Sequence, residues 1–245
     1  MKYSWKPDVP DQRDYTFTKL LTALPALIDL RKGELPVFDQ KNLGSCTGNA
    51  WAGLYAFDMQ KQGESVFIPS RLFIYYNERV IEGTVNEDAG AMIRTGAKVL
   101  AKIGVCSEKH WAYVPIKYKI KPTTTCYEEA AKFKALTYSR VPRTLHAMKS
   151  CLAGGYPFVV GFSVYESFES EQVAKTGIMP LPSPTEALLG GHAVVVVGYD
   201  DAHQHFIVRN SWGSKWGDKG HFYMPYHYLL DSNLSDDFWT IQKVS

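Results

Sequence analysis

A single cysteine in a turn-rich stretch is the first candidate for chemistry in this sequence. Cys46 precedes a segment whose apolar residues recur at the spacing of one helix face. The pattern predicts a helix of about four turns that begins near Cys46 and ends before Gly63. The helix dipole and the unpaired N–H groups at a helix start favour a thiolate, which is the reactive form of cysteine.

The alternative interpretation is that Cys46 is a small buried side chain, the usual state of a free cysteine. The neighbours argue against it, because Gly44, Ser45, Thr47 and Gly48 are residues typical of turns and caps. A cysteine nucleophile also needs a base, and the base needs a group that orients it.

Candidates for that base and its partner lie far downstream, on two strand-like runs. His192 opens a β-branched run that extends to Tyr199, and a second run, residues 205–208, leads to Asn210. The polar residues 200–204 between them are typical of a hairpin turn, which would place His192 and Asn210 at the same end of adjacent strands. A side-chain amide there can accept a hydrogen bond from one imidazole nitrogen and leave the other nitrogen for the thiol.

The order of these residues resembles the papain family of cysteine peptidases (C1-type), and its microbial members more than the plant or lysosomal ones. The resemblance covers roughly residues 25–230. It rests on Gln40 six positions before the cysteine, Gly44-Ser45-Cys46, Gly191-His192-Ala193, and Asn210-Ser211-Trp212-Gly213 followed by Trp216-Gly217.

Two positions depart from the family pattern. Thr47 follows the cysteine where the family usually has tryptophan, and Leu43 stands where members usually carry a disulfide-forming cysteine. The first change removes packing at the helix start and the second removes a covalent cross-link. Neither change removes a catalytic group.

The resemblance implies an α+β fold of two lobes, one helical and one an antiparallel β-barrel-like lobe, with the active-site cleft between them. Residues 35–135 would form the helical lobe and residues 136–245 the β-rich lobe. Residues 1–34 would be either an arm on the surface or a built-in cap in the cleft. Family proenzymes usually carry a much longer helical pro-region, and the prolines of residues 1–34 argue against a long helix.

The resemblance also implies a thiol mechanism. Cys46 would attack a peptide carbonyl as a thiolate, with His192 as acid and base and Asn210 as its orienting partner. Gln40 and the backbone N–H of Cys46 would form the oxyanion hole. Trp212 would cover the hydrogen bond between His192 and Asn210. A resting thiolate–imidazolium pair predicts activity on a broad plateau from mildly acidic to neutral pH.

Substrate contacts follow from position in the family. Gly90 would let the substrate backbone approach closely. Ala91, Met92 and Ala193 would line a pocket for the second side chain before the scissile bond, the P2 residue. An apolar pocket predicts Leu, Val or Phe at P2, and endopeptidase activity is expected.

Local patterns predict the remaining elements. Ser70 is a candidate N-cap for the helix that follows it, and a third helix is expected from Ala91 to Ile103, closed by Gly104. A short helix is predicted at residues 144–153. Strands are expected at residues 138–141, 158–164, 193–199, 206–209 and 222–225.

Charge and hydropathy argue against several classes of partner. The sequence has 27 Lys and Arg against 25 Asp and Glu and no basic block, so neither nucleic acid nor a membrane is an expected partner. The first residues are not followed by the apolar region of a signal peptide, and the compartment stays open between the cytoplasm and export with the leader absent. We expect a monomer that acts on peptides or proteins and needs no cofactor.

The other cysteines and two histidines have structural or solvent-exposed interpretations. Cys106 and Cys126 form the candidate disulfide, and Cys151 is expected to be a buried thiol. His203 and His205 form a His-x-His pair that could bind a metal. Such a pair without a cysteine or carboxylate partner is usually solvated, so no metal site is predicted.

Two other functions stay compatible with the sequence. A catalytically silent relative would bind peptides or inhibit proteases, although such relatives usually lack the Cys, His or Asn that are all present here. A transpeptidase or ligase would pass the same acyl-thioester to an amine, and product analysis with an added amine would distinguish it.

Overall fold

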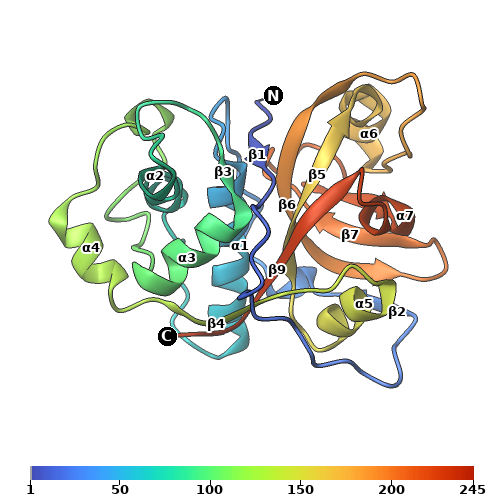
Figure 1. Ribbon diagram of the computed structural model, residues 1–245, viewed down its shortest axis with the longest axis horizontal. Helices are drawn as coiled ribbons and strands as arrows, with labels where there is room; N and C mark the ends of the chain where they lie inside the picture. Colours follow the sequence, from blue (N-terminus) through green and yellow to red (C-terminus); the bar gives the residue numbers. More distant parts are fainter. Residues whose placement is uncertain (1) are drawn as a thin grey trace.

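The computed structural model describes residues 2–245. Helices α2, α3 and α4 lie in one half, the long strands lie in the other half together with α5, α6 and α7, and α1 runs between the two halves (Figure 1). The helices are α1 (Cys46–Lys61), α2 (Arg71–Glu82), α3 (Ile93–Lys102), α4 (Thr124–Ala130), α5 (Leu145–Ala153), α6 (Glu171–Thr176) and α7 (Tyr226–Leu230), with short 3-10 helices at Arg31–Gly33, Pro115–Lys117 and Glu166–Glu169. The strands are β1 (Trp5–Lys6), β2 (Leu27–Asp29), β3 (Ala91–Met92), β4 (Ala135–Arg140), β5 (Phe158–Tyr165), β6 (Leu188–Asp200), β7 (His205–Arg209), β8 (His221–Pro225) and β9 (Ser235–Val244).

The first two helices begin where the sequence predicts them. α1 begins at Cys46 and ends just before Gly63, which has a φ of 74°. The hydroxyl of Ser70 accepts a hydrogen bond from the Phe73 N–H and so caps α2. Gly83 ends α2 in the left-handed conformation that glycine adopts without strain.

The third helix begins later than predicted. Ala91 and Met92 are extended and pair with β1, so α3 starts only at Ile93. The predicted short helix is present as α5, and Thr144 caps it through a hydrogen bond from the Ala147 N–H. A tertiary contact with the N-terminal segment therefore changes one predicted helix boundary, and the short helices α4, α6 and α7 were not predicted.

The sheet runs in the order β4-β9-β5-β6-β7-β8, with β2 added beside β6. Every pairing within it is antiparallel. All five predicted strands are present, several of them longer than predicted, while β9 was not predicted although it pairs with both β4 and β5. The two aspartates near its start and the polar residues near its end interrupt the apolar pattern that marks a strand.

Apolar packing fixes α1 against the sheet. Trp51 and Tyr55 on α1 share one buried cluster with Val195 on β6 and Trp239 on β9. A second cluster lies within the sheet half and includes Phe162. Because α1 is held rigidly against β6, its first residue has a defined position relative to the residues on that strand.

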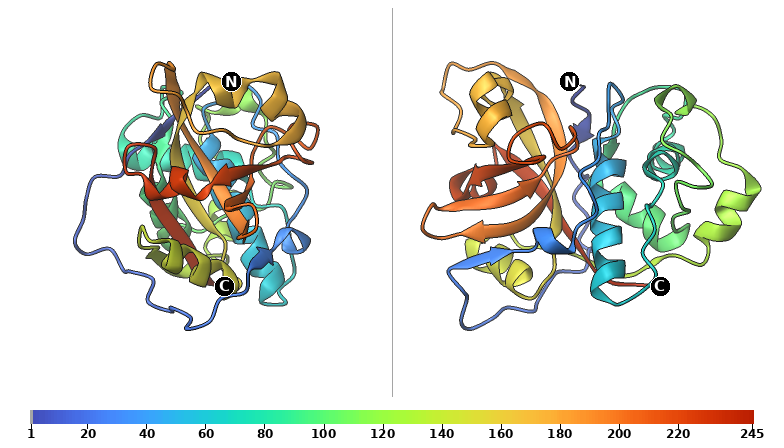
Figure 2. Two further views of the ribbon diagram at one scale, coloured as in Figure 1. Left: turned by 90° about the vertical axis from the view of Figure 1, so that its right-hand side faces the viewer. Right: turned by 180° about the vertical axis from the view of Figure 1, so that it is seen from behind.

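The N-terminal segment contacts both halves. Its first residues run between α3 and β9, drawn in dark blue in Figure 1, and the chain then crosses the surface to β2 (Figure 2). β1 pairs with β3 in parallel, and β2 pairs with β6 in antiparallel. Phe17 is only 2% exposed and belongs to the core of the sheet half. The segment thus packs between the two halves at its start and lies on the surface further along.

Cysteine pairing differs from the prediction. Within the described residues all four cysteines are buried free thiols, so Cys106 and Cys126 do not form the expected disulfide. They lie in one small cluster with Phe73, and the Thr123 hydroxyl contacts the Cys126 sulfur at 3.2 Å. Cys151 is buried as predicted, and its thiol donates to the Tyr156 carbonyl.

Among residues 2–245, no helix has the length and apolar character needed to cross a membrane.

Candidate active site

The structure brings together the cysteine, histidine and asparagine that the sequence singled out. Cys46 is the first residue of α1, His192 lies on β6, and Asn210 directly follows β7. The backbone N–H of Ala193, the neighbour of His192, points at the Cys46 sulfur. All four residues are buried. The hairpin of β6 and β7 therefore carries the imidazole and the amide to the start of α1.

Asn210 holds His192 in a fixed orientation. The imidazole Nε2 and the Asn210 Oδ1 are 2.8 Å apart, so Nε2 carries the proton and donates it to the amide oxygen. The indole of Trp212 stacks on the imidazole, with ring centroids 5.2 Å apart and an interplanar angle of 24°. The indole therefore packs beside the hydrogen bond between His192 and Asn210. Nδ1 of His192 has no hydrogen-bond partner within residues 2–245.

Gln40 is buried and oriented from both ends of its side chain. Its Nε2 donates to the Leu43 carbonyl at 3.0 Å, and its Oε1 accepts from the Ser211 hydroxyl at 2.6 Å. These two contacts fix which end of the amide is the nitrogen, and they leave the second N–H of Nε2 for another acceptor. Cys46 begins α1, so its backbone N–H has no acceptor within the helix.

The N-terminal segment covers these residues. The Ser4 hydroxyl lies 3.6 Å from the Cys46 sulfur and donates to the Gly44 carbonyl at 2.7 Å. The ring of Tyr3 packs edge-on against both His192 and Trp212, with centroids 6.2 Å away in each case. Residues of this chain thus occupy the space directly above the thiol and the imidazole.

Burial under this segment sets the protonation states. Burial is the largest cause that raises the pKa of the Cys46 thiol, although the Ser4 hydroxyl acts in the opposite direction. Burial lowers the pKa of His192 to about 4, against a smaller opposite effect of the Asn210 hydrogen bond. Burial therefore favours the neutral form of both groups in this covered state. The resting ion pair stays a prediction, and burial under the N-terminal segment works against both of its charges, because a low-dielectric surrounding disfavours charged groups.

Gly90, the predicted contact for a substrate backbone, lies against the backbone of the N-terminal segment. It has a φ of 70°, and a Cβ built on it would lie 1.7 Å from the Ser4 carbonyl oxygen. Ala91 is the register partner of Trp5 in the β1–β3 pair, and Met92 is that of Lys6. The backbone of residues 90–92 therefore does bind an extended chain, and here that chain is the N-terminal segment.

The side chain of Trp5 packs against two glycines, Gly191 of the histidine motif and Gly161, which the sequence did not single out. A Cβ on Gly161 would lie 2.0 Å from the Trp5 indole, and one on Gly191 would lie 2.7 Å from it. The indole N–H donates to Asp237 Oδ2 at 3.1 Å. Ala193 lies in the hydrophobic cluster against which Trp5 packs. No local signal marks Gly161 or Asp237, because they belong to strands that only the sheet brings to Gly191.

The comparisons with known proteins agree with this geometry. A family model described as papain family cysteine protease matches residues 24–233. The chain belongs to this family. Xylellain, a cysteine protease from Xylella fastidiosa, has a crystal structure that matches this fold with a TM-score of 0.95 at 46% identity, covering 99% of this chain and 96% of that one.

Two relatives by sequence show where in the family the chain lies. It is 46% identical over 264 residues to an uncharacterized peptidase C1-like protein of Acanthamoeba polyphaga mimivirus, covering 96% of this chain and 85% of that protein. It is 29% identical over 217 residues to chymopapain of Carica papaya, covering 86% of this chain and 57% of that protein. The chain is a papain-like cysteine peptidase with the predicted papain-like α+β fold, closer to these microbial and viral proteins than to chymopapain.

Proposed function

We propose that this papain-family peptidase is an endopeptidase in which Cys46 is the nucleophile, His192 the acid and base, and Asn210 the group that orients His192. The 2.8 Å contact between His192 Nε2 and Asn210 Oδ1 carries the proposal. It leaves Nδ1 as the nitrogen that exchanges a proton with the thiol and with the leaving amine. An acyl-thioester on Cys46 then forms, and a water activated by His192 hydrolyses it.

Gln40 and the Cys46 backbone N–H are the proposed oxyanion hole. Both donors belong to buried groups held before any substrate arrives. Donors fixed in this way stabilise the tetrahedral oxyanion without reorganising during the reaction.

Residues 2–9 are the proposed cap of this site. In a substrate, the residue in the P2 pocket precedes the residue whose carbonyl the thiol attacks. Here Trp5 occupies the pocket beside Ala91 and follows Ser4, which lies at the thiol. The segment therefore runs opposite to a substrate, so it fills the cleft without presenting a carbonyl in the direction needed for attack.

The pocket around Trp5 supports a preference for an apolar P2 residue. Its walls are the backbone at Gly161 and Gly191 together with Ala193, and glycine walls leave room for a large flat side chain. We expect Phe, Leu and Val to be accepted at P2, and aromatic residues most readily. A dipeptide substrate library tests this, and a preference for Arg with Phe and Leu rejected would contradict it.

The decisive test of activity is hydrolysis of dye-linked dipeptides by the wild type and by Cys46→Ala. We expect activity that requires Cys46, depends on reductant and is lost on labelling with a thiol inhibitor. Cys151→Ser is the matched control, because Cys151 is an equally buried thiol outside the cleft. A well-folded wild type without activity, even after the cap is displaced, would instead indicate a peptide-binding relative.

The cap is tested by Trp5→Asp, which places a carboxylate next to Asp237. An unpaired buried charge costs several kcal/mol, so the segment should leave the cleft and kcat/KM should rise about tenfold or more. Tyr15→Asp is the control, because Tyr15 is 76% exposed on the same segment. Unchanged kcat/KM in a folded Trp5→Asp protein would show that the segment does not limit access.

A further inference from the structure

Three side chains with metal-binding atoms meet at the end of the β6–β7 hairpin that lies away from His192 and Asn210. Asp200 is the last residue of β6 and His205 the first of β7, and the two are direct register partners. His203 lies in the turn between them. One ligand atom from each residue lies within 4.8 Å of those of the other two.

The hairpin holds these groups in place before any ion is bound. Asp200 Oδ2 is 2.7 Å from Nδ1 of His203, and its Oδ1 accepts the Ala202 N–H at 2.9 Å. The two imidazole rings are stacked, with centroids 5.4 Å apart and an interplanar angle of 12°. Behind them, the ring of Tyr223 contacts His205 with centroids 4.7 Å apart. Little conformational entropy remains to be lost when a ligand joins the three groups.

We propose that Asp200, His203 and His205 bind a divalent transition-metal ion, with Zn²⁺ the best match. Imidazole nitrogen and carboxylate oxygen are ligands of Zn²⁺, Ni²⁺ and Cu²⁺, whereas Ca²⁺ and Mg²⁺ prefer oxygen alone. A His-x-His pair alone offers no carboxylate ligand. Asp200 supplies one, because it precedes the turn that ends at His205 and pairs with His205 across the hairpin.

The surroundings leave room for a further ligand on the ion. Three protein ligands leave one position of a tetrahedral ion open. The site lies on a surface pocket of about 600 Å³ that Thr176 and Ile178 also line. His203 is 70% exposed at its side chain, so the ion can enter from solvent without local unfolding.

The site is separate from the thiol chemistry and also contacts the N-terminal segment. His192 and Asp200 are eight residues apart on one strand, which at about 3.3 Å per residue is roughly 25 Å. Asp200 is also the register partner of Leu27 on β2, which lies beside the β6–β7 hairpin (Figure 2). A bound ion would therefore brace the edge where β2 docks, whatever the catalytic role of Cys46.

Zinc titration of the full Cys46→Ala chain by calorimetry tests the proposal, because this variant removes the competing active-site thiol. We expect one ion per chain, and a visible absorption band when Co²⁺ replaces Zn²⁺. Loss of a residue that only supports a metal ligand weakens metal binding by about 10–100-fold. His203→Ala and His205→Ala each remove a ligand itself, so each should weaken Zn²⁺ binding by at least that much. His146→Ala is the control, because His146 is an exposed histidine elsewhere on the surface.

Thermal unfolding provides a second measurement on the same variants. At a free Zn²⁺ concentration of 100 times Kd, the Tm of Cys46→Ala should rise by about 5–10 °C, and this shift should vanish in His203→Ala. The Tm without metal shows that each variant is folded. Equal Zn²⁺ affinity in His203→Ala, His205→Ala and His146→Ala would overturn the proposal, as would an equal Tm shift with Ca²⁺.

Discussion

Ser211 links Gln40 to the His192–Asn210 pair. Its hydroxyl donates to Gln40 Oε1 at 2.6 Å, and its carbonyl accepts the Gln40 N–H at 2.8 Å. Its own N–H donates to Asn210 Oδ1 at 2.8 Å. One residue therefore positions both the proposed oxyanion donor and the partner of the proposed base.

The Gln40→Ala substitution tests the oxyanion role. Removing one oxyanion donor lowers kcat by about 10²–10³-fold, and KM should change little. Ser211→Ala should give a smaller loss, because it removes only the group that orients Gln40. Steady-state kinetics on one dipeptide substrate measure both effects. A Gln40→Ala protein with wild-type kcat would exclude Gln40 from the oxyanion hole.

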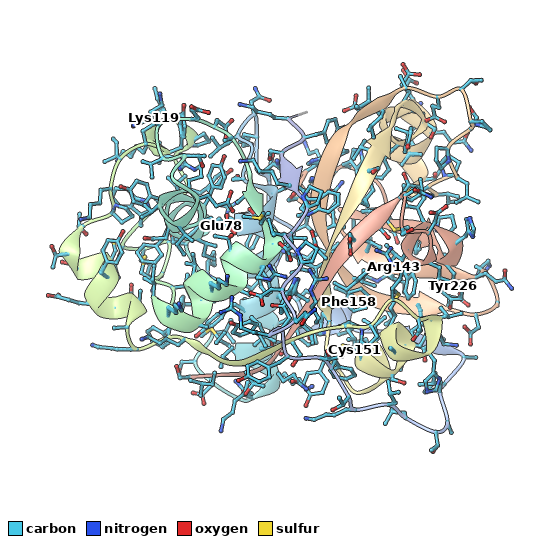
Figure 3. The ribbon with its side chains drawn as sticks, in the orientation of Figure 1. Glu78, Lys119, Arg143, Cys151, Phe158 and Tyr226 are labelled. Carbon is cyan, nitrogen blue, oxygen red and sulfur yellow. The ribbon has the colours of Figure 1, made fainter. Side chains whose placement is uncertain are left out.

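Thr47, which stands where the family usually has tryptophan, has a buried carboxyl partner. Its hydroxyl is 2.7 Å from Glu78 Oε2, and Glu78 Oε1 has no hydrogen-bond partner within the described chain. Glu78 lies in the helical half (Figure 3). Burial raises the pKa of Glu78 from 4.5 to about 8, so the carboxyl is protonated at neutral pH. Only a tertiary structure reveals this pair, because the residues lie on different helices.

Glu78→Gln should remove a pH dependence of stability. The pKa is raised on folding, so the stabilising effect of the proton is complete below 4.5 and is lost as pH rises through about 8. Glutamine is neutral at every pH in this range and avoids this loss. At pH 8 the Tm of the variant should be several degrees above that of the wild type, since about 1 kcal/mol in the free energy of unfolding shifts Tm by 2–4 °C. At pH 4 the two Tm values should converge. Melting curves across this range measure the effect, with exposed Glu128→Gln as control.

At the scale of elements, strand β1 is held in the cleft by a buried ionic network. Asp237 on β9 accepts hydrogen bonds from the Trp5 indole and from the Asp8 N–H, at 3.1 and 2.8 Å. Asp8 accepts from the Trp239 indole at 2.8 Å, and Arg140 contacts both carboxylates. Burial, reinforced by the charge of Asp8, raises the pKa of Asp237 to about 7. Docking of β1 therefore depends on the protonation of this pair.

The sign of that dependence predicts release of the segment as pH rises. The docked state holds a proton on Asp237 up to about pH 7, whereas a solvated Asp237 would lose it near its ordinary pKa of 3.8. Falling pH thus favours docking, and rising pH favours release. Iodoacetamide alkylates Cys46 when the segment has left it, so the rate of this alkylation measures release. We expect the rate in the wild type, divided by the rate in Asp237→Asn at the same pH, to rise several-fold from pH 5 to pH 8. A ratio that stays flat would show that Asp237 does not control the segment.

At the scale of the molecule, residues 2–34 connect both halves at several separate places. β1 lies in the cleft, Phe17 is part of the sheet-half core, and β2 extends the sheet at β6. Residues 18–23 between Phe17 and β2 are exposed. The segment is therefore anchored on both sides of one accessible loop.

Cutting this loop should not by itself open the active site. A specific protease site built into residues 19–22 of the full chain allows one cut there. Residues 2–17 should stay bound through Asp8 and Phe17 after the cut. The cut removes the covalent link that keeps the segment at a high effective concentration, so the segment should dissociate, and activity should rise, only when the protein is diluted. Activity assays and gel filtration of cut protein measure this. Full activity at the moment of cutting, with the fragment still bound, would refute the cap.

Local signals in the sequence determined much of the helical half and singled out the residues of the proposed site. Ser70 caps α2 as predicted, and residues 200–204 form the predicted turn between β6, which carries His192, and β7, which Asn210 follows. Each of these features depends on residues close together in the chain, where caps, turns and periodicity act. The cysteine, histidine and asparagine motifs gave the family for the same reason, since each motif is a short run.

Only the tertiary structure decided what fills the cleft and how it is charged. Ser4 lies at a cysteine 42 residues away, and Trp5 meets an aspartate 232 residues away on a strand that no local pattern indicated. Burial by other segments raises the pKa of the thiol and lowers that of the imidazole, so it favours the neutral form of both. Contacts between distant segments leave no periodic trace in a sequence, and protonation depends on burial, which exists only after those segments have packed.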